Sequence, residues 1–149
     1  MSADESLNNA ENLLARLEAA RARLDETQDP DQAIEIRINA EDPEHDFRPS
    51  PGLVSLFKPA EGPGVRVDTF IESGTVIPPF YDSMIAKLVV WDNDRAAAIA
   101  RAERALLETT IVGVPTTRDL ALEVLGSEPF RSGDYSTSTL DALRAEVVA

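Results

Sequence analysis

The sequence predicts an α+β fold: a small antiparallel sheet with flanking helices, plus an N-terminal amphipathic helix. Three observations lead to this prediction. Leucine and alanine recur at helical spacing before Pro30. Alternating apolar and polar segments, separated by turn residues, then run as far as Trp91. Helical spacing returns after Asp94. This order leaves little room for a doubly wound sheet, and it divides the chain into a helix with a linker (residues 1–30) and one domain (residues 31–149).

The first element is expected to be a helix over residues 2–27. Ser2 and Glu5 have the spacing of a capping box, and Pro30 marks the stop. Apolar residues form one stripe, which is interrupted at Arg21. The stripe consists of Leu7, Ala10, Leu13, Leu14, Leu17, Ala20 and Leu24. Such a stripe either packs on the main domain or pairs with another chain. Roughly three heptads are too few to indicate a coiled coil by themselves.

Strands are expected in the middle of the chain. Residues 33–40 alternate strictly, so the three isoleucines share one face and Glu35, Arg37 and Asn39 share the other. Residues 84–91 are more uniformly apolar, which indicates a buried central strand. Further short strands or extended pieces are predicted over residues 53–58, 65–69 and 74–79.

Three helices are expected after the strands. Asp94 caps the first, in which Ile99, Ala102 and Leu106 recur on one side. Thr116 or Thr117 caps the second, and Gly126 ends it. Its inward residues are predicted to be Leu120, Ala121, Val124 and Leu125. The last helix is predicted over residues 138–147.

Composition excludes several functions. The net charge of −13 opposes nucleic-acid binding, and no apolar run approaches the roughly 20 residues that span a membrane. The acidic first residues resemble neither a secretory nor a transit signal, so a cytoplasmic protein is expected. There is no cysteine, and the single histidine, His45, lies in a polar loop. Neither a metal site nor a Ser-His-Asp triad is therefore predicted, and no glycine-rich phosphate loop is present.

The best candidate site is the polar face of the first strand, with Glu35, Arg37 and Asn39. An arginine fixed on a strand can bind an anion or stabilise a developing oxyanion. The same pattern also describes an ordinary solvent-facing strand with an internal ion pair. Arg66 and Asp82 lie in two further candidate segments. These residues alone favour a binding or assembly domain over a free-standing enzyme.

Several segments together resemble the C-terminal domain of biotin carboxylases. The first is IEIRINAEDP at residues 34–43, which FRPSPG at residues 47–52 continues in register. The others are GPGVRVD (62–68), PPFYDSM with AKL (78–84 and 86–88), GVPTT (113–117) and FRSGDY (130–135). The resemblance covers about residues 31–141, and its specificity comes from the number of ordered motifs.

The resemblance implies a function. Biotin carboxylases are ligases that use ATP, bicarbonate and magnesium to carboxylate biotin on a biotin carboxyl carrier protein. They serve acetyl-CoA carboxylase in fatty acid biosynthesis, and propionyl-CoA and pyruvate carboxylases. Arg37 matches the family arginine that approaches the ureido group of biotin, which implies a catalytic role. Glu35 and Asn39, on the same strand, are assigned to substrate binding, and Arg66 and Asp82 to a dimer interface.

The chain departs from the family pattern before residue 31, where a predicted helix replaces the N-terminal and ATP-grasp domains. The chain alone is therefore expected to be inactive, and to need the ATP-grasp part, the carrier protein and the carboxyltransferase as partners in a homo-oligomer. The alternative is a non-catalytic assembly protein or an engineered fragment of this domain. A small-ligand binder on the same fold is a third reading.

Overall fold

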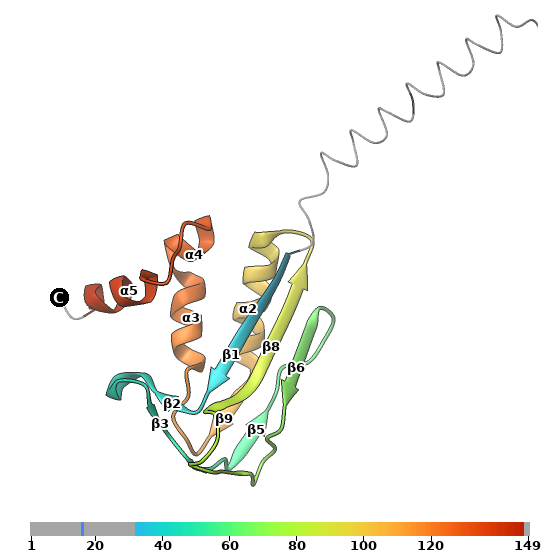
Figure 1. Ribbon diagram of the computed structural model, residues 1–149. Coiled ribbons are helices and arrows are strands. Elements are labelled where there is room, and N and C mark those ends of the chain that lie inside the picture. The colour runs from blue at the N-terminus through green and yellow to red at the C-terminus, as the bar shows by residue number, and fades with distance from the viewer. Residues whose placement is uncertain (1–15, 17–31, 148–149) are drawn as a thin grey trace, which may run out of the picture.

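The computed structural model describes Arg16 and residues 32–147, and it has the expected α+β architecture (Figure 1). The predicted helix over residues 2–27 lies outside the described residues, apart from Arg16. The strands are β1 (Gln32–Asn39), β2 (Glu41–Asp42), β3 (Arg48–Pro49), β4 (Gly52–Leu53), β5 (Leu56–Lys58), β6 (Val65–Thr69), β7 (Val76–Ile77), β8 (Met84–Asp92) and β9 (Thr110–Val112). The α-helices are α2 (Arg95–Glu108), α3 (Arg118–Gly126), α4 (Glu128–Ser132) and α5 (Thr139–Val147).

The main sheet has three antiparallel strands in the order β1-β8-β6. β8 is the central strand, as its apolar composition predicts, and Leu88 and Val90 on it are buried. Ile34, Ile36 and Ile38 of β1 are also buried, which confirms the predicted inner face. Alternation therefore decides which side chains of this sheet reach solvent.

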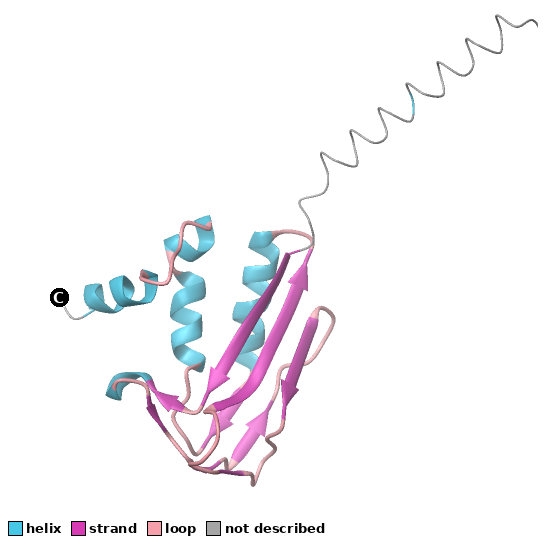
Figure 2. Ribbon diagram, viewed as in Figure 1, coloured by secondary structure: helices cyan, strands magenta, loops and turns pink. Residues whose placement is uncertain are grey.

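The helices cover one face of this sheet (Figure 2). α2 packs on β1 and β8, and α3 packs on α2 and β1. Asp94 caps α2 as predicted, since its side chain accepts a hydrogen bond from the backbone N–H of Ala97. Ile99 and Leu106 of α2 are fully covered and join the core. The opposite face of the sheet is left for charged residues.

The predicted strand over residues 53–58 is in fact two strands with different partners. β4 pairs with β7, whereas β5 pairs with β9. The chain changes partner at Val54, which is fully buried and bonds to the backbone of residues 74 and 75. Gly113 permits this crossing: it has φ +118°, and a Cβ there would lie 2.1 Å from the carbonyl oxygen of Leu53.

α3 begins and ends where the sequence predicts, with two differences. The N-cap is Thr117, but its side chain caps nothing, because its Oγ1 accepts a hydrogen bond from the Asn39 backbone N–H at 3.0 Å. Of the predicted inward residues only Leu125 is buried, whereas Leu120, Ala121 and Val124 are half-buried. The described residues therefore cover that side of α3 only in part.

Candidate functional site

The face of the main sheet opposite the helices carries a group of charged side chains. Its members come from all three strands and comprise Glu35, Arg37, Arg66, Asp68 and Lys87. The strand register places Arg37, Lys87 and Asp68 side by side in one row. Glu35 and Arg66 lie in the next row. Two of the sequence-predicted site residues, Glu35 and Arg37, are therefore brought together with Arg66, which was assigned to the interface.

Arg37 is fixed by its strand but open to an incoming molecule. Its side chain is 68% exposed, and its Nε lies 3.2 Å from Glu35 Oε1. Within the described part of the chain, Glu35 is the only partner of this guanidinium. The two terminal nitrogens keep their donors, in the planar fork that suits an oxyanion.

Glu35 is shared between two cations. Its Oε1 faces Arg37, and its Oε2 lies 3.7 Å from the Nζ of Lys87. Lys87 lies directly opposite Arg37 on the neighbouring strand. Two like charges at such a position repel each other, so the carboxylate between them stabilises both. Glu35 thus positions the arginine while leaving the outer edge of the guanidinium free.

Arg66 and Asp68 form a bidentate ion pair on β6. Arg66 donates from Nε to Asp68 Oδ1 at 2.9 Å and from Nη2 to Oδ2 at 2.6 Å. These hydrogen bonds hold the pKa of Asp68 below its usual value, and they raise the pKa of Arg66. The Arg66 side chain is 65% exposed, so it remains accessible for contacts with another molecule.

Asn39, at the end of β1, is half-buried and bonds to residues other than those of the charged row. A register shift follows Ile38 at the end of β1. The Asn39 amide then donates from Nδ2 to Glu41 Oε1 at 3.3 Å, and Ser83 Oγ donates to the same oxygen. Asn39 Oδ1 is buried and accepts no hydrogen bond from any described residue. No described hydrogen bond joins Asn39 to Arg37, and its predicted role in substrate binding stays a prediction.

Asp82 stiffens the turn that leads into β8. Its Oδ1 accepts a hydrogen bond from the backbone N–H of Met84 at 2.8 Å, as the predicted turn requires. The next residue is tied to the end of β1, because Ala40 N–H donates to the Ser83 carbonyl oxygen at 2.8 Å. Phe80 and Tyr81, just before it, are among the most exposed large side chains of the described residues. The turn therefore presents aromatic surface at the β1 end that lies beyond Arg37.

Two residues that contact the candidate site residues could not be identified as such from the patterns considered above. Lys87 is the only charged residue within residues 84–91, and a single charge in an apolar strand could have indicated a residue of the site. Glu41 accepts hydrogen bonds from Asn39 and Ser83, and this arrangement depends on Ser83 approaching Glu41, which is 42 positions away in sequence. No local pattern could have revealed it.

The structure offers no metal centre among the residues that it describes. His45 lies in the exposed 3-10 turn Pro43–His45, where its Nδ1 is 2.7 Å from Asp42 Oδ2. This hydrogen bond lowers the pKa of Asp42. Nor does any helix among residues 32–147 combine the length and hydropathy needed to cross a bilayer.

Comparison with known proteins agrees with this geometry. The family model described as "Biotin carboxylase C-terminal domain" matches residues 35–142. A biotin carboxylase of Nostoc sp. is 48% identical over 125 residues, which are 84% of this chain and 28% of that protein. One pyruvate carboxylase subunit, from Methanothermobacter thermautotrophicus, is 47% identical over 117 residues, 78% of this chain and 24% of that protein. The chain spans about a quarter of the length of these relatives.

Solved structures give the same result. The biotin carboxylase subunit of a pyruvate carboxylase matches with a TM-score of 0.74 at 38% identity, over 78% of this chain and 26% of that one. The biotin carboxylase domain dimer of Hydrogenobacter thermophilus 2-oxoglutarate carboxylase, in complex with MgADP, ADP and bicarbonate, matches with a TM-score of 0.72 at 40% identity. That match covers 74% of this chain and 24% of the other. The family match, the sequence identities and the shared fold together mean that this chain belongs to the biotin carboxylase C-terminal domain family.

Proposed function

We propose that this chain serves as the C-terminal part of the biotin carboxylase component of a biotin-dependent carboxylase. In this role it lends the charged face of β1 to a site that the ATP-grasp part of a biotin carboxylase completes. The observation that carries the proposal is the state of Arg37: it is anchored through Nε, and its two terminal nitrogens are open to solvent. This arrangement leaves the fork of the guanidinium available to an oxyanion on a bound molecule.

Arg37 would act on the ureido group of biotin. Biotin supplies a nitrogen that accepts the carboxyl group, and negative charge develops on the ureido oxygen as that nitrogen becomes nucleophilic. Preorganised donors aimed at developing charge lower the barrier, because they need no reorganisation during the reaction. The rigid strand and the Glu35 contact supply this preorganisation. Glu35 and Asn39 would border the bound ring, and Lys87 would add a second positive charge beside it.

The partners follow from the same proposal. ATP and magnesium would be bound by an ATP-grasp polypeptide, since the motifs of this chain provide no phosphate loop. Biotin would arrive on a carrier protein, and a carboxyltransferase would use the product, in acetyl-CoA carboxylase and fatty acid biosynthesis or in a related cytoplasmic pathway. Arg66 and Asp82 would contribute to contacts within a homo-oligomer. The open position of the Arg66–Asp68 pair supports this placement.

A complementation experiment tests the proposal. The Nostoc biotin carboxylase, truncated before the segment that this chain matches, would be mixed with this chain, biotin, bicarbonate and MgATP. We expect ATP cleavage that depends on biotin only when both polypeptides are present. Arg37→Ala should lower that rate about 100-fold or more, which is the usual effect of removing a donor to a developing oxyanion. Arg37→Lys keeps the charge but loses the fork, so its rate should lie between those of the wild-type chain and Arg37→Ala.

The matched control is Arg104→Ala. Arg104 is also exposed and ion-paired, but it lies with Glu108 on α2, which covers the face of the sheet opposite the charged residues. Its replacement should leave the rate unchanged. Equal rates for the wild-type chain and Arg37→Ala would refute the catalytic role. Binding of the two polypeptides without biotin-dependent turnover would instead favour the assembly reading.

A further inference from the structure

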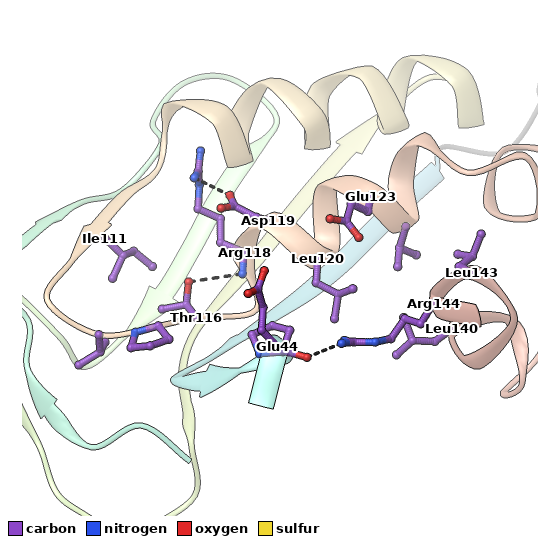
Figure 3. Close-up of a pocket in the computed structure, with 14 residues that line it drawn as sticks. Glu44, Ile111, Thr116, Arg118, Asp119, Leu120, Glu123, Leu140, Leu143 and Arg144 are labelled. Carbon is purple, nitrogen blue, oxygen red and sulfur yellow. Dashed lines mark hydrogen bonds and ion pairs between the residues drawn. The ribbon is translucent and has the colours of Figure 1, made fainter. Parts of the chain in front are cut away.

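An open apolar groove lies between β1, α3 and α5. Its apolar lining, which we call the α3–α5 groove, includes Ile34, Ile36, Leu120, Val124, Leu140 and Leu143. One hollow of about 380 Å³ is lined by all six of these residues and, at its edge on β1, by Glu35 and Arg37. A second hollow of about 710 Å³ shares the four residues from the two helices. Figure 3 shows this second hollow, with Leu120 on α3 facing Leu140 and Leu143 on α5.

Arg144 joins α5 to the segment between β2 and β3. Arg144 of α5 donates from Nη2 to the carbonyl oxygen of Pro43, and its guanidinium lies 4.9 Å from the centre of the Phe47 ring. Arg144 and Pro43 themselves line the larger hollow (Figure 3). Leu120 and Val124, which helical spacing predicts to be inward, are half-buried. Apolar side chains lined up along such a hollow favour an apolar occupant.

We propose that the occupant is the leucine stripe of this chain's own N-terminal segment, residues 7–24. That stripe is the longest apolar surface that the sequence predicts outside residues 32–147. The segment ends close to the groove: seven residues separate Leu24 from Gln32, where β1 begins, and the same strand supplies Ile34 and Ile36 to the groove lining. This inference does not depend on the proposed enzymatic function.

Chain lengths are compatible with the proposal. Seven extended residues reach up to about 25 Å, which is enough for the chain to reverse direction before β1. A helix over residues 7–24 would be about 27 Å long, and its leucines would lie on one side of it. Pro30 interrupts helical geometry within the connection and so favours a change of direction there.

A second copy of the chain is a weaker candidate for the same stripe. A short tether gives an intramolecular contact an effective concentration of about millimolar, well above that of a dilute protein. Roughly three heptads also offer a short seam for a coiled coil. The groove of the same chain is therefore the favoured binding site for the leucine stripe.

Paramagnetic NMR on the full chain tests the inference directly. The chain has no cysteine, so Arg16→Cys accepts a single nitroxide at an exposed position. In a chain that carries both ¹⁵N and the label, the amide signals of Leu120, Val124, Leu140 and Leu143 should broaden. The amides of β5 serve as an internal reference. A mixture of labelled ¹⁴N chain with unlabelled ¹⁵N chain should leave all of these signals sharp.

Substitutions in the stripe complete the test. Leu17→Asp in the labelled chain should restore the sharp groove signals, because a carboxylate cannot enter an apolar hollow without a partner. Ala19→Asp, which introduces the same group on the opposite side of the predicted helix, should leave them broadened. Broadening seen mainly in the mixed sample would assign the stripe to a second copy and overturn the proposal. Groove signals that stay sharp in both samples would overturn it as well.

Discussion

At the scale of single residues, Arg66 and Asp68 illustrate how an exposed ion pair affects titration. The two hydrogen bonds from Arg66 favour the ionised form of Asp68, which lowers the pKa of Asp68. A carboxyl group whose pKa falls on folding stabilises the folded state above its unfolded pKa. That contribution is lost as the pH falls through the folded pKa, that is, below about pH 4. Solvent screening keeps the contribution small.

The prediction is that Arg66→Ala raises the pKa of Asp68 toward its ordinary value. Carboxyl ¹³C chemical shifts, followed from about pH 6 down to pH 2, would measure it. Asp42 provides the internal control, since its pKa is lowered by His45 and not by Arg66. If the titration of Asp68 is unchanged in Arg66→Ala, the bidentate pair does not persist in solution.

The accessibility of Arg37 could be predicted from sequence, but the position of Asn39 could not. Strict alternation puts Glu35 and Arg37 on the outer face, and both are exposed. Asn39 continues the same alternation but is half-buried, at the point where the pairing of β1 with β8 shifts register. A shift of this kind depends on how the two strands end together, and those strands are more than forty residues apart in sequence.

At the scale of elements, Thr109 joins the end of α2 to the turn after β5. It is the only polar side chain among the fully buried described residues. Its Oγ1 donates to the Ala105 carbonyl oxygen at 2.8 Å and accepts from the backbone N–H of Ala60 at 3.2 Å. Thr109→Val preserves the shape but leaves the Ala60 N–H without its partner. We expect a loss of about 1–3 kcal/mol in the free energy of unfolding, measured with urea.

Thr110→Val is the matched control. Thr110 is the next residue, it is half-buried, and its hydroxyl group makes no hydrogen bond with the described residues. The same change there should alter the free energy of unfolding by no more than about 0.5 kcal/mol. Equal stability of Thr109→Val and the wild type would mean that water replaces the threonine hydroxyl.

Long periodic elements were predictable, whereas short ones were not. β1 and α2 show their period over eight or more residues, β8 is a nine-residue and mostly apolar strand, and all three were located from sequence. β9 has three residues, and its partner β5 lies some fifty positions earlier, so its pairing leaves no local signal. α4 has five residues and follows the turn at Ser127. Such elements are fixed by tertiary contacts rather than by local pattern.

At the scale of the whole molecule, the excess of negative charge lowers the stability of the folded state. The described ion pairs use some of the acidic groups, but the chain keeps a net charge of −13. Exposed carboxylates without described partners include those of Glu61, Glu72 and Asp134. Folding brings these like charges together, so their repulsion lowers stability. Salt shortens the screening length from about 10 Å at 0.1 M to about 3 Å at 1 M.

The midpoint of urea unfolding should therefore rise when NaCl is increased from about 0.1 M to 1 M. Salt can also strengthen apolar burial, so the variant Glu61→Lys/Glu72→Lys/Asp134→Lys separates the two causes. Each substitution changes the charge by two units, which takes the net charge from −13 to −7. If screening is responsible, the triple variant is more stable at low salt and responds less to added NaCl. An identical salt response in both chains would assign the effect to apolar burial, because the core is unchanged between them.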